Sequence, residues 1–402
     1  MHQTKITSLF FMILLLLVTA LAVPRAAAAQ EPAVYEAEGF SYSLDEEGNA
    51  TILSYTENKK SLAVPSALDG HPVTGIGYRA FSLCESLRDI TLPDSLLSIG
   101  DQAFYNCTSL KSITLPEGLT TIGDRAFAYC RSLTQISLPD SLAFIGEEPF
   151  IYGSKLAAIK VSAKNEAYTA IDGVLFNKSG DTLLVYPQGR NKTSYAVPEG
   201  VSSIGNSAFT ENRHLKKVSL PNGLLHIGQT AFASCTSLGS IELPPGLLTI
   251  GDGAFAYCTS LPGITLPDSL TSLGDEAFYY CESLEVISLP EGLDAIGQRA
   301  FANCKSLSII GLPERLLSIG GEAFAYCTSL NSILLPEGLE SIGDKAFYYC
   351  ESLKGITLPV SLLSIGDKVF DGCDLIIAGS DNSISFAYAQ QEGIPFKNAS
   401  GN

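Results

Sequence analysis

The chain has 402 residues, a formal net charge of −17 at pH 7, and 46% hydrophobic residues. Phosphate recognition needs clustered Lys and Arg, and the sequence has no such cluster, which argues against a nucleic-acid partner. The same acidic balance disfavours adhesion to anionic lipid headgroups. The apolar content is sufficient for a large continuous core.

Residues 1–29 have the features of an export signal. Lys5 provides a short basic region, residues 9–22 are apolar, and the alanines at 26–29 offer a cleavage site for signal peptidase. The alternative is an uncleaved anchor helix, but the apolar run is shorter than the ~20 residues that a membrane span needs. We therefore expect a signal peptide at 1–29 and a secreted or cell-surface protein without a membrane span in the mature chain.

From Cys84 onward the sequence repeats with a fixed period. Cys84, Cys107 and Cys130 are equally spaced, and the cysteines from Cys235 to Cys373 keep the same spacing. A period of this length, about 23 residues, is typical of a solenoid, in which each unit buries its apolar face only by stacking on its neighbours. An Ile-Gly-x-x-Ala-Phe-like marker identifies twelve copies, at Phe81, Phe104, Phe127, Phe150, Phe209, Phe232, Phe255, Phe278, Phe301, Phe324, Phe347 and Phe370.

The repeat from Leu110 to Cys130 shows the expected local structure. Its Leu-x-x-Ile-x-Leu pattern predicts a short strand, which Pro116 ends because proline cannot donate to a ladder. Asp124 is placed as the N-cap of a short helical turn whose Ala, Phe and Cys share one inward face. The predicted fold class is an α/β repeat, a right-handed solenoid with a parallel β-sheet on one face and short helical turns on the other.

The period breaks once, and both ends of the chain differ from it. Gly153 and Asn212 hold the next two cysteine positions, and the interval between them is more than twice the period. A segment of about 36 residues is therefore inserted, in which two apolar runs around 177–181 predict a protruding β-hairpin. We divide the chain into an N-terminal β cap (30–75), repeats (76–160), a β-hairpin insert (161–197), further repeats (198–375) and a C-terminal cap (376–402).

These residues resemble the BspA-like leucine-rich repeat family. The family repeat, L-P-x-x-L-x-x-I-G-x-x-A-F-x-x-C-x-S-L-x-x-I, is matched at nearly every position from Leu92 to Leu358, and the insert also resembles that family's recurring interruption. The resemblance covers essentially the whole mature chain and implies a leucine-rich-repeat solenoid. It further implies a secreted or cell-surface protein, since some members act as adhesins for host matrix proteins or other microbes.

The cysteine and acidic columns have plain structural interpretations. Stacked cysteines have parallel Cβ vectors about 5 Å apart, too far for a relaxed disulfide, and a straight column does not supply four convergent zinc ligands. We expect buried free thiols that behave as small hydrophobes. Acidic residues after each repeat's glycine and strand proline suit helix capping and corner solvation rather than calcium, because no calcium motif is present.

Tyrosines just before the cysteine position are the candidate ligand contacts. Packing between neighbouring turns is the alternative, but tyrosine offers contact area at low entropic cost. The competing surface is the strand face, whose exposed positions are mostly small, as at Ser112 and Gly263. The candidates are Tyr129, Tyr257, Tyr280, Tyr326 and Tyr349.

We see no catalytic constellation, metal site or cofactor site in the sequence. We therefore expect a monomeric, non-enzymatic, adhesin-like interaction module for host or microbial surface proteins or glycans. A structural or decoy surface protein without a specific ligand is the main alternative, and an enzyme is a more remote one.

Overall fold

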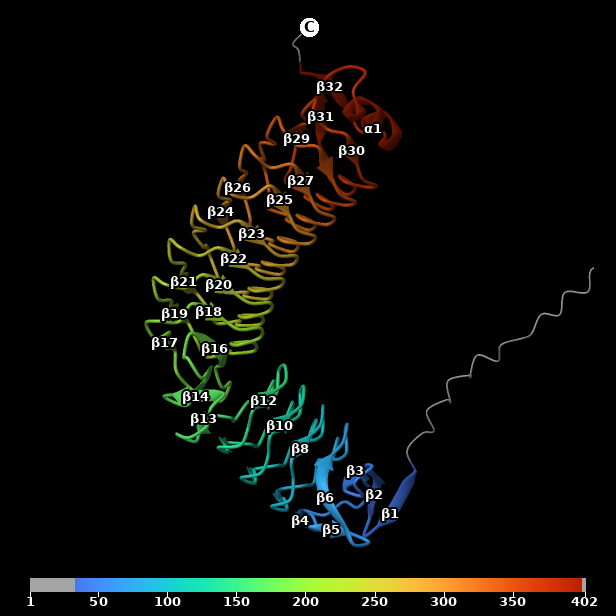
Figure 1. The fold of residues 1–402 in the computed structure, drawn as a ribbon. Helices are drawn as coiled ribbons and strands as arrows, with labels where there is room; N and C mark the ends of the chain where they lie inside the picture. The colour runs from blue at the N-terminus through green and yellow to red at the C-terminus, as the bar shows by residue number, and fades with distance from the viewer. Residues whose placement is uncertain (1–32, 400–402) are drawn as a thin grey trace, which may run out of the picture. The chain divides into compact units, whose positions relative to one another are not determined.

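The computed structural model describes residues 33–399 of the chain (Figure 1). The expected signal peptide at 1–29 lies outside the described residues. Most repeats contribute two short strands, where the sequence predicted one. In the repeat from Leu110 to Cys130 these are β9 (Ser112–Thr114) and β10 (Thr121–Ile122). β10 pairs in parallel with the same strand of both adjacent turns, so that Thr121 lies opposite Ser98 and Phe144. β9 pairs in parallel with the same strand of the turn before it, where Ile113 lies opposite Ile90.

Two columns of parallel strands result. The first column contains β4 (Ser61–Ala63), β7 (Asp89–Thr91), β9, β11 (Gln135–Leu138), β13 (Ala158–Val161), β17 (Ser194–Ala196), β19 (Lys217–Ser219), β21 (Ser240–Glu242), β24 (Val286–Ser288), β26 (Ile309–Gly311), β29 (Gly355–Thr357), β31 (Ile376–Gly379) and β32 (Phe396–Asn398). The second contains β6 (His71–Ile76), β8 (Ser98–Ile99), β10, β12 (Phe144–Ile145), β16 (Thr182–Val185), β18 (Ser203–Ile204), β20 (His226–Ile227), β22 (Thr249–Ile250), β23 (Ser272–Leu273), β25 (Ala295–Ile296), β27 (Ser318–Ile319), β28 (Ser341–Ile342) and β30 (Ser364–Ile365). The remaining elements are β1 (Val34–Ala37), β2 (Phe40–Leu44), β3 (Ala50–Tyr55), β5 (Ala67–Leu68), β14 (Tyr168–Ile171), β15 (Val174–Asn177) and α1 (Ile384–Glu392).

The prediction of short helical turns in the repeats is wrong. Among residues 33–399 the structure contains one helix, α1, and it lies in the C-terminal cap. In the segment after the recurring glycine, Arg125 and Tyr129 have left-handed φ values of 51° and 61°, which an α-helix does not accommodate. Their N–H groups bond to the next turn, as does that of Phe127, which donates to the Pro149 carbonyl at 2.8 Å. Bonding between turns therefore replaces bonding within a helix.

The recurring phenylalanines form a ladder through the core. Phe232 and Phe255 are fully buried, with ring centroids 5.3 Å apart and an interplanar angle of 2°. The same stacking links neighbouring rings from Phe81 to Phe150 and from Phe209 to Phe370. Each aromatic pair adds about 0.5–1.5 kcal/mol beyond its buried area, so the ladder stabilises every junction between these turns.

The recurring cysteines each form a hydrogen bond between adjacent turns, with the exception of Cys84 in the first repeat. The Cys304 thiol donates to the Phe278 carbonyl at 3.1 Å, and nine cysteines make the equivalent bond to the preceding turn. All ten are free thiols and eight are buried, which confirms the prediction of buried thiols. Burial raises the pKa of Cys235 and of Cys281 to about 12.

The acidic column after the glycines does not cap helices, contrary to the expectation. The Asp101 carboxylate accepts the Asp124 N–H of the next turn at 2.9 Å, and the Asp252 carboxylate accepts the Asp275 N–H at 2.9 Å. The glycine before each acid is needed for this approach, because a Cβ on Gly274 would lie 2.4 Å from the Asp252 N and Oδ1 atoms. The Ile-Gly-Asp signature is thus a docking element between turns.

The insert belongs to the stack and does not protrude. Strands β14, β15 and β16 pair antiparallel, and β16 pairs in parallel with β18 of the next repeat. Within β15, Val174 and Phe176 join the C-terminal hydrophobic cluster, whereas Leu175 joins the N-terminal cluster. The solenoid prediction holds, but the expected continuous core is two clusters that meet at this strand.

A buried asparagine attaches the insert to the repeat before it. Asn165 is fully buried, and its Nδ2 donates to the carbonyls of Pro139 at 2.7 Å and Leu142 at 2.9 Å. Its Oδ1 accepts the N–H groups of Ala167 and Tyr168. One side chain therefore satisfies four backbone groups where the repeat pattern is interrupted.

Both ends of the stack are covered. At the N-terminus β1, β2 and β3 form an antiparallel meander, and β3 pairs in parallel with β6. At the C-terminus α1 begins at its N-cap Ser383 and ends at Gly393, which has a φ of 68°. The Tyr388 hydroxyl of α1 accepts the Val369 N–H of the last turn at 2.8 Å. Such caps shield the terminal cores of a solenoid from water.

Candidate functional site

The predicted tyrosines occupy a column of left-handed residues along one edge of the stack. We call this surface the tyrosine edge; it consists of Tyr129, Tyr152, Tyr257, Tyr280, Tyr326 and Tyr349, whose φ values lie between 54° and 61°. Asn106 and Asn303 hold the same column in other repeats, also at positive φ. Asparagine adopts the left-handed conformation more readily than tyrosine does. The backbone preference of this position therefore does not explain why tyrosine occupies it in six repeats.

The structure brings these tyrosines together as three separate pairs. The ring centroids are 4.3 Å apart for Tyr129–Tyr152, 5.0 Å for Tyr257–Tyr280 and 5.5 Å for Tyr326–Tyr349, with interplanar angles of 17–20°. Asn303 separates the second pair from the third. The tyrosine edge is therefore a set of aromatic islands and not a continuous stripe.

Exposure differs among the five predicted residues. Tyr257, Tyr326 and Tyr349 are exposed, at 39–42%, whereas Tyr129 and Tyr280 are half-buried against their stacking partners. Three rings therefore combine an accessible face with a position fixed by a neighbouring ring, which reduces the entropy lost on binding.

Ion pairs flank two of the islands. Arg299 lies between Glu276 at 3.2 Å and Glu322 at 2.9 Å, and Lys305 contacts Glu282 at 2.7 Å. Exposed pairs of this kind contribute at most about 1 kcal/mol to stability. They surround the aromatic islands with charged groups, an arrangement that resembles an aromatic interface centre with a polar rim.

The strand face carries an apolar patch that we did not expect from the sequence. Val286 and Ile309 lie opposite each other on β24 and β26, each about half exposed, and Leu334 is 83% exposed. We expected mostly small residues at the exposed strand positions, on the pattern of Ser112 and Gly263. Extending the alternation of inward and outward residues to every repeat would have revealed the patch.

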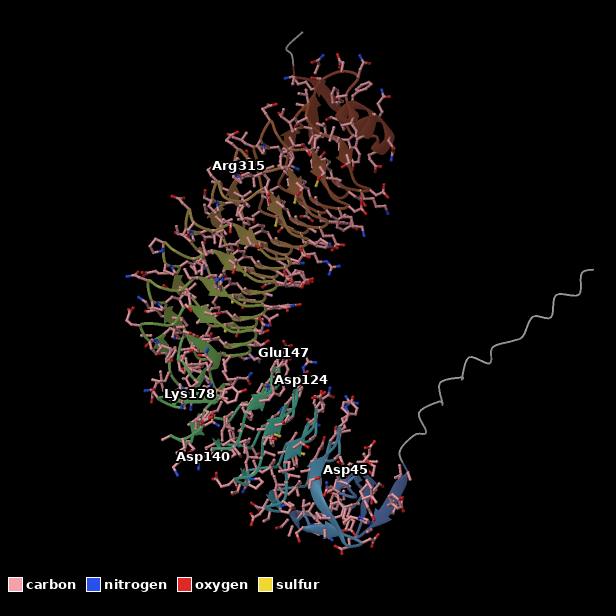
Figure 2. The ribbon with its side chains drawn as sticks, in the orientation of Figure 1. Asp45, Asp124, Asp140, Glu147, Lys178 and Arg315 are labelled. Atoms are coloured by element: carbon pink, nitrogen blue, oxygen red, sulfur yellow. The ribbon has the colours of Figure 1, made fainter. Side chains whose placement is uncertain are left out.

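Neither a metal site nor a membrane-spanning helix is present among the described residues. Within residues 33–399, no three His, Cys, Asp or Glu side chains come close enough together to hold a metal ion. No helix in the same range is long and apolar enough to cross a bilayer. Charged side chains such as Asp45, Asp140, Lys178 and Arg315 are distributed over the surface of the turns (Figure 2).

Parallel strands repeated every turn, a stacked aromatic core and capped ends define a leucine-rich repeat solenoid. The sequence matches the BspA type leucine rich repeat region in six copies, over residues 60–183, 185–282 and 248–377. These matches span well over half of the chain, which therefore belongs to the BspA-type leucine-rich repeat family. No curated protein matches the sequence significantly.

Solved structures share the fold. A leucine-rich repeat protein from Bacteroides ovatus is 27% identical, with a TM-score of 0.59 over 90% of this chain and 99% of that one. A leucine-rich repeat protein from Eubacterium ventriosum is 23% identical, with a TM-score of 0.61 over 86% and 96%. The pneumococcal vaccine antigen PcpA is 19% identical, with a TM-score of 0.51 over 91% and 98%.

Proposed function

We propose that this chain is an exported, non-enzymatic binding protein that acts at a cell surface as an adhesin-like interaction module. Its ligand is a host or microbial surface protein or glycan, and its contacts are made by the tyrosine edge. The observation that carries the proposal is the presence of exposed tyrosines held in fixed stacked pairs at positive φ. Rigid tyrosines of this kind are the anchors that interfaces use most often.

Two further observations support a binding role over catalysis. Repeat solenoids present extended surfaces on which successive turns contact one large partner. In the described residues, His71 bonds to the Gly48 carbonyl at 2.8 Å. The exposed His226 lies 2.9 Å from the Thr249 hydroxyl, but no third group among the described residues orients its imidazole as a catalytic base requires.

Export is proposed from the N-terminal sequence and is supported by the family. The basic start, the apolar run at 9–22 and the alanines at 26–29 fit a cleaved signal. The cysteines are compatible with an oxidising compartment as well, because eight of the ten free thiols are buried.

The direct test is a binding screen with the purified chain against extracellular matrix proteins, mucins and a glycan array, using the heat-unfolded chain as control. We expect saturable binding to at least one of these ligands by the folded chain only. Absence of binding to all three classes would contradict the proposal and favour a structural or decoy role.

A further inference from the structure

The bonding between turns is interrupted on one side of the insert. In the preceding turn, three N–H groups donate to carbonyls of the next at 2.8–2.9 Å: Arg125 to Glu147, Phe127 to Pro149 and Tyr129 to Ile151. Glu148, Phe150 and Tyr152 hold the equivalent positions one turn later. Among the described residues, none of their N–H groups has a hydrogen-bond acceptor. This turn therefore presents the free edge of a backbone ladder.

The second strand column is interrupted at the same place. β12 pairs with β10 on one side only, and on its other side the Ile145 N–H is taken by the Tyr168 hydroxyl at 2.8 Å. Ile145 is half-buried, whereas Ile99 and Ile122 at the same position are fully buried. The missing neighbour thus leaves the Ile145 side chain partly uncovered, while the Tyr168 hydroxyl satisfies its N–H group.

The aromatic ladder stops there as well. Phe127 stacks on Phe150 at 5.8 Å, and Tyr186 stacks on Phe209 at 5.0 Å, so Tyr186 takes the phenylalanine place in the insert. Within residues 33–399 no ring contact joins Phe150 to Tyr186. The aromatic ladder is therefore interrupted between Phe150 and Tyr186.

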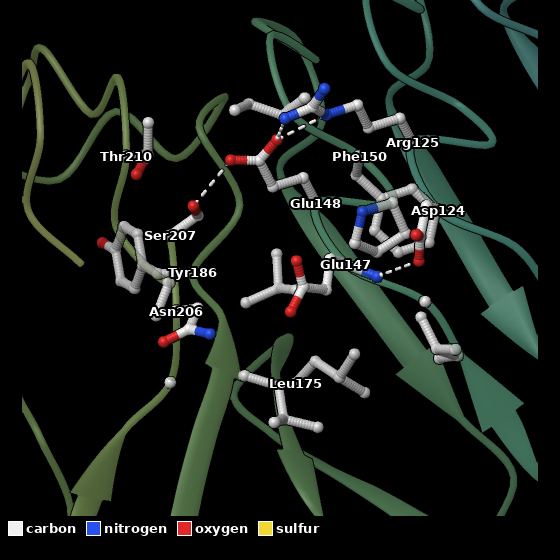
Figure 3. A pocket seen from close by; sticks show the side chains of 18 of the residues that line it. Asp124, Arg125, Glu147, Glu148, Phe150, Leu175, Tyr186, Asn206, Ser207 and Thr210 are labelled. Atoms are coloured by element: carbon white, nitrogen blue, oxygen red, sulfur yellow. Dashed lines mark hydrogen bonds and ion pairs between the residues drawn. The ribbon is translucent and has the colours of Figure 1, made fainter. Parts of the chain in front are cut away.

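A cleft of about 730 Å³ occupies this interruption (Figure 3). We call it the break cleft; residues 144–151 line one wall, and residues 184–188 and 205–210 line the other. Its apolar lining includes Ile145, Phe150, Leu175, Leu184 and Val185. One hydrogen bond spans it, from the Ser207 hydroxyl to the Glu148 carboxylate at 2.7 Å. The volume is in the range of natural ligand sites.

The charge of the break cleft selects among ligands. Its lining carries the carboxylates of Asp124, Glu147 and Glu148, with Arg125 as the only cation among the lining residues described. Arg125 is neutralised by Glu148 at 2.6 Å, and Asp124 accepts the Glu147 N–H at 2.7 Å. The Glu147 carboxylate has no hydrogen-bond partner among the described residues and points into the space between the walls (Figure 3). The site therefore favours a cation beside Glu147.

We propose that the break cleft binds an extended basic peptide segment of a partner protein. The peptide lies along residues 147–152 in the place of the missing turn, and its carbonyls accept from the free N–H groups of Glu148, Phe150 and Tyr152. These main-chain bonds supply affinity as they do in β-strand addition, although residues 147–152 are not themselves a strand. One apolar side chain enters between Phe150 and Tyr186, and an adjacent Lys or Arg, which points the other way along a strand, pairs with Glu147. Of the tyrosine edge this site includes only the backbone of Tyr152 and none of the five candidate ligand contacts, so its test is independent of that proposal.

The probe is a fluorescein-labelled, acetylated peptide of sequence Gly-Arg-Phe-Arg-Gly, with Gly-Glu-Phe-Glu-Gly as control, followed by fluorescence anisotropy. We expect the basic peptide to bind, and the acidic one to bind at least tenfold more weakly at low salt. Glu147→Gln should weaken binding about fivefold. Asp367→Asn is the matched control, because Asp367 holds the same exposed repeat position in the last turn, and it should leave binding unchanged.

Hydrogen exchange locates the bound peptide. We expect the amides of Glu148, Phe150 and Tyr152 to exchange more slowly in its presence, while those of Arg125 and Phe127, already bonded, remain unchanged. Three results would overturn the proposal: no binding at about 1 mM peptide, a millimolar interaction being the weakest class of complex; equal effects of the two charge variants; or protection confined to other turns. Saturable binding of a neutral glycan in the cleft that excludes the peptide would overturn it as well.

Discussion

Replacing Gly274 by alanine tests whether the Ile-Gly-Asp signature docks one turn onto the next. The added Cβ would lie 2.4 Å from both the backbone N and the Oδ1 of Asp252, where ordinary contacts begin at 3.4 Å, so the two turns must separate by about 1 Å. Two of the hydrogen bonds across this junction lie beside the added Cβ, from Gly274 N–H to the Ile250 carbonyl and from Asp275 N–H to Asp252 Oδ1, both at 2.9 Å.

The expected loss follows from these contacts. Overpacking against fixed backbone costs about 1–3 kcal/mol, and each strained hydrogen bond adds about 1 kcal/mol. We expect Gly274→Ala to lower the free energy of unfolding by about 3 kcal/mol. Urea denaturation followed by circular dichroism and tyrosine fluorescence measures the change, since the chain has 17 tyrosines and no tryptophan.

Gly223→Ala is the matched control for this prediction. A Cβ at Gly223 meets no atom within 4 Å, and its φ is not left-handed. Alanine there should leave stability unchanged or raise it by up to about 1 kcal/mol, through lower entropy of the unfolded chain. If the two variants were equally stable, the docking role assigned to the glycine would be refuted.

Three further predictions concern the core and the insert. First, alkylation of the native chain at mildly alkaline pH should modify Cys84 and Cys373, the half-buried thiols, while the eight buried thiols react only in denaturant; mass spectrometry that finds all ten modified in the native state would contradict this. Second, burial raises the pKa of Cys235 and Cys281 to about 12, so the folded state holds its thiol protons where the unfolded state has already lost them. Their contribution to stability should be complete below the ordinary thiol pKa and decline as pH rises toward 12, and a flat profile of unfolding free energy across that window would refute it. Third, Asn165→Ala leaves four backbone groups without their side-chain partner and should destabilise the chain by about 3 kcal/mol, measured by urea denaturation; a loss below about 1 kcal/mol would mean that water replaces the amide.

The repeat and its inward residues could be predicted from the sequence because they depend on a period. The Phe and Cys positions recur at one fixed spacing, and stacking brings such positions into contact whatever the local conformation. The local conformation itself was harder to predict. Ala126, Phe127 and Cys130 have the spacing of a helix, yet backbone N–H groups of this segment donate to carbonyls of the next turn. No pattern within one repeat distinguishes hydrogen bonds to the next turn from hydrogen bonds within a helix.

The features of the insert could not be predicted for a different reason. Asn165 lies one period after Leu142 and Tyr186 one period before Phe209, so the period reaches both positions. Their side chains differ from the repeat residues Leu and Phe, and the period does not indicate what the replacements do. The break cleft depends on the absence of a neighbour for residues 147–152 and joins Glu148 to Ser207, which are far apart in the sequence. The candidate tyrosines could be located from sequence, but their separation into pairs depends on ring geometry that only the structure shows.

The most direct measurement compares two triple variants for binding to a ligand found in the screen. The first removes three rings of the tyrosine edge with asparagine, which natively holds this left-handed column at Asn106 and Asn303: Tyr257→Asn, Tyr280→Asn and Tyr326→Asn. The second removes the apolar strand-face patch: Val286→Ser, Ile309→Ser and Leu334→Ser. Both should fold, as checked by circular dichroism.

We expect the tyrosine variant to bind at least tenfold more weakly, because each anchor of this kind contributes about 1 kcal/mol or more. The strand-face variant should bind like the unaltered chain. Unchanged affinity in a folded tyrosine variant, together with lost affinity in the strand-face variant, would contradict the proposal and place the ligand on the strands.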